Sequence, residues 1–198
     1  MRALQLGCAL WLCLWGQAMA AVSPLDYTRA TLQQASAIVS SDQPHNQKLT
    51  ALSALFRKFL DTDTMGRAVL GPRWSSLTPA QQKEFLILFG ELFERTYVSK
   101  LLLFERPHFA YVGETLLQGG GGLVDTKIVT AQDEFAVVYV LRPQGNSWLV
   151  TKIMVEDVSL TANLAAQFDR LLSRASVEDM LDLLQKKYGH GVKEEEGP

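Results

Sequence analysis

The chain has 198 residues, of which 47% are hydrophobic and 20% are charged, a composition that suits one ordinary globular domain or two small lobes sharing one core. Collagen, a disordered tail and a multispan membrane protein are excluded. Because 19 lysines and arginines oppose 21 aspartates and glutamates, the chain lacks the positive excess that nucleic acid phosphates select, and nucleic acid is not expected as a partner.

Residues 1–20 have the features of a secretory signal peptide. The only charge in this segment, on Arg2, is followed by an apolar run and by Ala18-Met19-Ala20, the small-x-small pattern that signal peptidase cuts. A membrane-spanning anchor is the competing interpretation, but the run is short and is interrupted by glycine and glutamine. We therefore expect the mature protein to begin at Ala21.

Both cysteines of the chain, Cys8 and Cys13, lie in this predicted signal peptide. The mature protein would then form no disulfide, would hold its fold by burial alone and would have no thiol for catalysis. An exported protein without disulfides fits a bacterial periplasm better than a eukaryotic extracellular space, so we expect a periplasmic location.

The first half of the mature chain is predicted to be helical. Apolar residues recur at helical spacing over residues 26–39 and 48–60, and a turn at Pro44 separates these two segments. A short helical segment over residues 61–70 ends at Gly71-Pro72, because glycine provides a flexible cap and proline cannot continue a helix.

A longer helix is predicted from residue 78 to about residue 104. Its start is indicated by a capping box, Thr78 to Gln81, with Pro79 at the first helical position. Its apolar residues cover more than the narrow stripe of an ordinary surface helix. They are Phe85, Leu86, Leu88, Phe89, Leu92, Phe93, Tyr97, Leu101, Leu102 and Phe104. Such a helix either is packed by protein on two flanks or lines a ligand cavity, and the pattern alone favours the first interpretation.

From Pro107 onward the hydrophobic period changes to two, which is typical of strands. Four strands are predicted in succession and in antiparallel pairing, and the segment 135–141 is apolar on both faces and therefore central. Two helices, over residues 161–173 and 177–188, complete the predicted domain of residues 21–188, and residues 189–198 form a charged, flexible tail. Helices, then strands, then helices indicate an α+β fold.

No motif of catalytic or metal chemistry is present in the sequence. A nucleophile elbow, a zincin motif, a phosphate-binding loop and a Cys-x-x-Cys pair are all absent. The histidines His45, His108 and His190 have no spacing that would form a metal-binding face. The four glycines 119–122 read as a hairpin connection rather than a phosphate cradle, because no helix follows them. We predict no catalytic residue, no metal and no cofactor, and a protein that is not an enzyme.

Three sequence blocks resemble, in order, the MlaC family, also known as the toluene-tolerance auxiliary proteins. The first is TMGRAVLGPRW at residues 64–74, continued by TPAQQKEF at residues 78–85. The second is LFERTY at residues 92–97, and the third extends from Trp148 to Phe168. The resemblance covers roughly residues 25 to 188.

This resemblance implies a soluble, monomeric periplasmic carrier in which a sheet and helices enclose an apolar cavity for the acyl chains of a phospholipid. It implies as partners an inner-membrane ABC transporter complex and an outer-membrane lipoprotein complex, between which the carrier exchanges lipid. The related HpnM branch implies a hopanoid as an alternative ligand. Asp157 and residues 163–165 depart from the family pattern, so the family's contacts there are not carried over.

A carrier requires a wide apolar wall, so the resemblance favours the cavity interpretation of the long helix. The ligand is predicted to lie between that helix and the sheet. The predicted wall positions are Phe89, Phe93, Tyr97, Leu101, Val138, Val140, Ile153 and Val155. The sequence leaves open which half of the strand positions faces the ligand.

Two other classes of protein are retained as alternatives. A ligand-free adaptor subunit of an ABC transport system would have a filled core. A small α+β barrel enzyme would need a polar cluster inside its cone, whereas the inward residues predicted here are almost all apolar.

Overall fold

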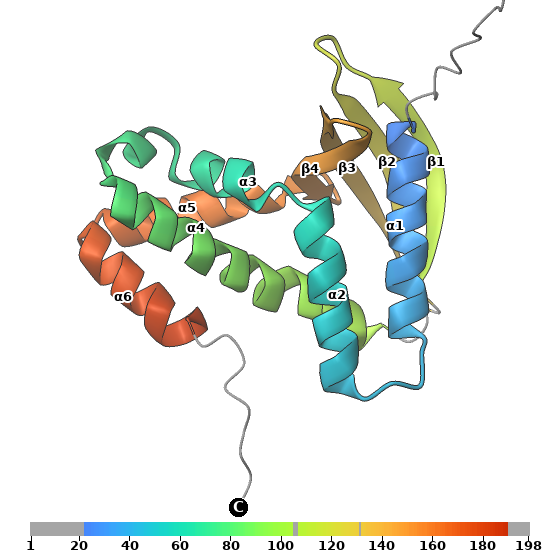
Figure 1. Cartoon of the computed structure of the whole chain (residues 1–198), viewed down its shortest axis with the longest axis horizontal. Helices are drawn as coiled ribbons and strands as arrows, with labels where there is room; N and C mark the ends of the chain where they lie inside the picture. The colour runs from blue at the N-terminus through green and yellow to red at the C-terminus, as the bar shows by residue number, and fades with distance from the viewer. Residues whose placement is uncertain (1–21, 105–106, 131, 190–198) are drawn as a thin grey trace, which may run out of the picture.

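The computed structural model describes residues 22–104, 107–130 and 132–189. The predicted signal peptide (residues 1–20) and residues 190–198 of the predicted tail lie outside the described residues. An antiparallel sheet and a cluster of helices lie side by side, with α1 along one face of the sheet and α2 between the two parts (Figure 1). The helices are α1 (Pro24–Val39), α2 (His45–Phe59), α3 (Thr62–Leu70), η1 (Gly71–Ser76), α4 (Pro79–Phe93), η2 (Glu94–Val98), η3 (Ser99–Leu103), α5 (Leu160–Leu172) and α6 (Val177–Tyr188).

Each described α-helix except α2 begins at a side chain that caps a free backbone N–H group. In α4 the Thr78 hydroxyl accepts from the Gln81 N–H while the Gln81 side chain accepts from the Thr78 N–H, which is the predicted capping box. Ser176 and Asp179 form a second capping box at the start of α6. Of the described helices, none is both long and apolar enough to cross a membrane.

The long helix predicted from residue 78 to about 104 has the expected extent but is not uniform. It is a regular α-helix only as far as Phe93. It continues as the π-helical turn η2 and the 3-10 turn η3. A π turn accommodates an extra residue, so side chains after it are rotated relative to those before it. No proline or glycine interrupts residues 91–104, and for this reason the sequence pattern did not predict the change.

The sheet is a simple meander in which every strand pairs antiparallel with the next. Its strands are β1 (His108–Leu116), β2 (Gly122–Val129), β3 (Glu134–Gln144), β4 (Ser147–Val155) and β5 (Val158–Ser159). The predicted antiparallel α+β fold is confirmed, with five strands instead of four. The fifth strand has two residues and follows a turn at Glu156 and Asp157, both with positive φ. A strand this short has no periodic pattern to reveal it.

The helical cluster is packed by aromatic side chains along one side of α4. Phe85 stacks on Phe89, with ring centroids 5.9 Å apart, and Phe89 contacts Phe93 at 6.0 Å. Phe168 of α5 meets Phe85 edge to face at 5.5 Å. These rings bury the start of the long helix against α5, while α3 and α6 also pack on α4.

Two glycines make the tightness of this packing testable. A Cβ atom on Gly66 of α3 would lie 2.9 Å from Leu86 and 3.1 Å from Phe89, whereas one on Gly90 of α4 would meet no atom within 4 Å. We expect Gly66→Ala to destabilise the protein by about 1 kcal/mol, because overpacking outweighs the gain in helix propensity. Gly90→Ala should stabilise it by about 0.5–1 kcal/mol. Denaturant unfolding of both variants measures these changes, and stabilisation by Gly66→Ala as well as by Gly90→Ala would contradict close packing at Gly66.

One acidic residue joins the helical part of the chain to the sheet. The Asp61 N–H donates to the carbonyl of Val150 in β4 at 2.8 Å. Its carboxylate caps α3 by accepting from the Thr64 N–H at 2.9 Å and pairs with Nε of Arg142 in β3 at 2.5 Å. Burial raises the pKa of the Asp61 carboxyl, but the hydrogen bonds from Thr64 and the Arg142 guanidinium outweigh this effect and hold the pKa below its usual value.

Candidate functional site

A cavity of about 340 Å³ lies between the sheet and the η2–η3 end of the long helix. It is bounded by side chains from α1, α2, α4, η2 and η3 on the helical side and from β1 to β4 and the start of α5 on the other. Its lining residues are Leu32, Phe56, Leu60, Phe93, Tyr97, Val98, Lys100, Leu101, Phe104, Phe109, Ile128, Phe135, Val137, Tyr139, Ile153, Val155 and Leu160.

The lining is apolar apart from Lys100 and the hydroxyl groups of Tyr97 and Tyr139. Tyr139 is buried, which raises its pKa, and its hydroxyl is hydrogen bonded with Thr126 on the neighbouring strand β2. Among the described residues, neither a carboxylate nor a histidine lines this cavity. Because nearly all of its lining is hydrocarbon, the cavity is suited to holding apolar groups away from water.

Five of the eight predicted wall positions line the cavity. They are Phe93, Tyr97, Leu101, Ile153 and Val155. Phe93 comes from the last turn of α4, Tyr97 and Leu101 from the two irregular turns that follow, and the other two from β4.

The other three predicted positions lie elsewhere. Phe89 is one turn before Phe93 and is fully buried in the helical cluster, where it contacts other aromatic rings rather than the cavity. Val138 and Val140 alternate along β3 with Val137 and Tyr139, and only the latter pair lines the cavity. Neighbouring strand residues point to opposite faces, and because the segment 135–141 is apolar on both faces its sequence did not indicate which set is inside.

Sequence reasoning missed the contributions of α1 and α2 to the cavity. Leu32 of α1, Phe56 of α2 and Leu60, the residue that follows α2, reach it from segments that precede the long helix in the chain. Helical periodicity identified their apolar faces but did not indicate what those faces cover. The three missed β3 positions, Phe135, Val137 and Tyr139, share one strand face, so a single correct assignment would have found all of them.

An apolar partition separates this cavity from a groove of about 400 Å³ on the outer surface, between α2 and α4. The partition consists of the four residues that line both spaces, Phe56, Leu60, Phe93 and Val98. All four are at least 93% buried. The cavity is thus closed toward α2 by one layer of side chains.

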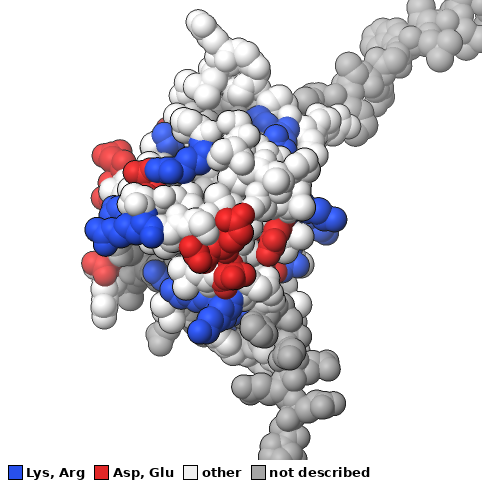
Figure 2. All heavy atoms as spheres, turned by 90° about the vertical axis from the view of Figure 1, so that its left-hand side faces the viewer, with Lys and Arg blue, Asp and Glu red and all other residues white. Residues whose placement is uncertain are grey.

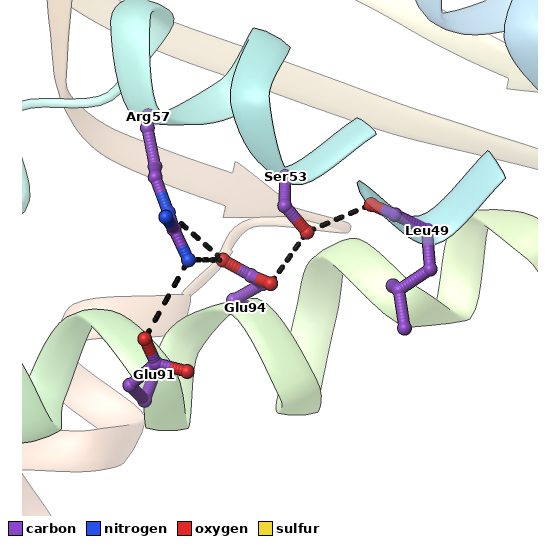
Figure 3. Close-up of polar contacts among 5 residues, drawn as sticks. All are labelled: Leu49, Ser53, Arg57, Glu91 and Glu94. Atoms are coloured by element: carbon purple, nitrogen blue, oxygen red, sulfur yellow. Dashed lines mark hydrogen bonds and ion pairs between the residues drawn. The ribbon is translucent and has the colours of Figure 1, made fainter. Parts of the chain in front are cut away.

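A polar network spans α2 and the start of η2 beside this partition (Figure 3). Arg57 pairs with Glu94 at 3.0 Å and with Glu91 at 3.5 Å. The Ser53 hydroxyl contacts the Glu94 carboxylate and also the carbonyl of Leu49 at 2.8 Å. Arg57 is 63% exposed, so its ion pairs contribute little stability, but they align α2 with the π-helical turn.

Other site classes find no support in the described part of the chain. It contains no cluster of three or more potential metal ligands. On the face formed by the helical cluster, acidic and basic side chains lie near one another and neither sign covers the surface (Figure 2). This distribution differs from the basic stripe that binds nucleic acid.

Comparison with known proteins identifies a family and a fold. The family model described as MlaC protein matches residues 28–186. Among solved structures, the chain is similar to a phospholipid-binding protein from Ralstonia solanacearum in complex with a phospholipid, with 18% sequence identity and a TM-score of 0.74. The similarity covers 84% of this chain and 97% of that chain. No curated protein matches the sequence.

Proposed function

Because the chain belongs to the MlaC family, we propose that it is a lipid carrier that binds a phospholipid with its acyl chains in the cavity between η2–η3 and the sheet. The observation that carries this proposal is the lining of that cavity, which is apolar except for two tyrosines and one lysine. The phospholipid bound to the Ralstonia solanacearum protein, which has a similar fold, supports it. The cavity volume also lies within the roughly 300–1,000 Å³ of ligand sites.

The energetics of lipid transfer are consistent with a carrier that performs no chemistry. Two acyl chains contain about 30 methylene groups, and hiding each from water is worth about 0.8 kcal/mol, which gives on the order of 20 kcal/mol. A bilayer hides nearly the same surface, so exchange between bilayer and carrier is close to neutral. Direction would then come from partner proteins or from ATP used elsewhere, and no catalytic residue is needed.

The proposed setting is the periplasm, where the carrier exchanges lipid between an inner-membrane ABC transporter complex and an outer-membrane lipoprotein complex. The signal peptide predicted for residues 1–20 and membership of the MlaC family support this location. The alternative ligand is a hopanoid, as in the HpnM branch. The alternative function is that of an adaptor that holds no lipid.

Organic extraction of the purified mature protein, followed by mass spectrometry, tests the proposal. We expect about one phospholipid per protein molecule, because an apolar cavity of this lining is unfavourable when filled with water. An unrelated exported protein purified in parallel is the control for carried-over membrane lipid. Recovery of hopanoids would show that the ligand is the alternative one. An amount of lipid no higher than in the control would contradict the carrier function.

A further inference from the structure

Two side chains that carry hydrogen-bond donors belong to the lining of the largely apolar cavity. Tyr97 of η2 and Lys100 of η3 both line it and are three residues apart. The Tyr97 side chain is partly buried and Lys100 is exposed, so both lie near the boundary between the cavity and water. Neither the Tyr97 hydroxyl nor the Lys100 ammonium has a hydrogen-bond or ion-pair partner among the described residues.

The third polar side chain of the lining, Tyr139, differs in this respect. The Tyr139 hydroxyl is hydrogen bonded with Thr126, whose own hydroxyl donates to the carbonyl of Val137 at 3.0 Å. Lys127 of β2 and Arg142 of β3 lie outside the lining and are paired with Glu134 and Asp61, respectively. Lys83 of α4 has no such partner in the described chain, but it lies outside the cavity lining. Lys100 is therefore the one charged group among the described residues that is placed at this cavity.

We propose that Tyr97 and Lys100 bind the phosphate group of the lipid whose acyl chains fill the cavity. This inference rests on the proposed carrier function and adds a preference for phosphate-bearing lipids over neutral lipids with the same chains. A lysine can lay its aliphatic stem along apolar surface while its ammonium remains in water, which is where a phosphodiester must also stay. The Lys100 ammonium and the Tyr97 hydroxyl donate to phosphate oxygens, and hydrogen bonds to a charged acceptor are the stronger kind.

The contribution of the Tyr97 hydroxyl to phosphate binding can be separated from the packing of the Tyr97 ring. Its ring lies 4.8 Å from the ring of Phe93, measured between centroids, so the aromatic group is part of the cavity wall. Tyr97→Phe removes the hydroxyl and keeps this contact. Any selective loss of phosphate-bearing lipid in this variant then reports on the hydroxyl alone.

The test compares two lipids that carry the same fluorescent acyl chain, phosphatidylglycerol and diacylglycerol, bound to delipidated protein. We expect Lys100→Gln and Tyr97→Phe each to weaken phosphatidylglycerol binding by up to about fivefold, the range of an exposed ion pair, with diacylglycerol binding unchanged. Lys100→Glu should weaken it further, and high salt should reduce the difference between Lys100→Gln and the unchanged protein. Lys83→Gln, which alters an exposed lysine outside the cavity, is the control and should bind both lipids normally.

The outcomes separate this inference from the proposed function. If the unchanged protein binds neither lipid, the proposed carrier function is wrong, and the proposed phosphate site is wrong as well. If both lipids bind and the variants leave phosphatidylglycerol affinity unchanged, or weaken both lipids equally, the carrier function stands and the phosphate site is wrong. Inorganic phosphate added as a competitor should not displace the lipid. If low millimolar phosphate did displace the lipid, Tyr97 and Lys100 would form a site for a free anion instead.

Discussion

Replacing Leu101 by tryptophan should remove most of the bound lipid while the protein stays folded. Leu101 lines the cavity from η3 and is only partly buried, so a larger side chain can occupy space that belongs to the ligand. Each acyl methylene displaced forfeits about 0.8 kcal/mol, and displacing two or three lowers affinity by roughly ten- to sixtyfold. The free energy of unfolding should change by less than about 0.5 kcal/mol.

The same substitution at Leu88 is the matched control. Leu88 belongs to the preceding part of the long helix, is 2% exposed and does not line the cavity. Because the Leu88 side chain is almost fully buried among its neighbours, a tryptophan there should overpack them at a cost of about 1–3 kcal/mol or more. Lipid content from extraction and melting temperature are measured on both variants. Full lipid content and a much lower melting temperature in Leu101→Trp would show that Leu101 belongs to a packed core.

Removing the carboxylate of Asp61 should produce the largest loss of stability among the polar substitutions considered. Its side chain is 6% exposed and serves both as the cap of α3 and as the partner of Arg142. A lost cap costs about 0.5–2 kcal/mol, and a broken ion pair with one buried member adds to this, so Asp61→Ala should cost about 2–4 kcal/mol. Denaturant unfolding measures this loss of stability. Asp63→Ala, two residues away at an exposed position, should cost less than about 1 kcal/mol.

The pH dependence of stability distinguishes the charge of Asp61 from its shape. Because the pKa of Asp61 is lower in the folded protein than in the unfolded chain, its contribution is fully present above the unfolded pKa of about 3.9. It is lost as the pH falls through the folded pKa. Asp61→Asn should therefore be less stable than the unchanged protein at neutral pH, and the difference should shrink below about pH 4. A difference that is constant from pH 7 to pH 3 would mean that the charge contributes nothing.

The predictions that succeeded rest on local chemistry. The capping box at Thr78 requires only residues within one helical turn, and α4 begins there. Strand alternation and the order of elements predicted an antiparallel α+β fold, which the sheet confirms. Three short sequence blocks predicted the family that the family model matches over residues 28–186.

The predictions that failed needed information from distant parts of the chain. The π-helical turn η2 has no sequence signal of its own, and it lies where Glu94 meets Ser53 and Arg57 of α2. The two-residue strand β5 depends on its pairing with Met154 and Val155 of β4. Neither contact can be inferred from a local pattern.

The amino-acid sequence by itself determined most of the helices and strands, their order and an abundance of apolar surface on both sides of the long helix and of β3. Only the tertiary structure decided that Val137 and Tyr139 line the cavity while Val138 and Val140 do not, and that Phe89 is core whereas Phe93 is wall. The physical reason is that burial of apolar surface is non-directional: it drives Phe89 and Phe93 inside with equal strength. Whether the space beside each is filled by protein or left for a ligand depends on how helices and strands far apart in the chain come together.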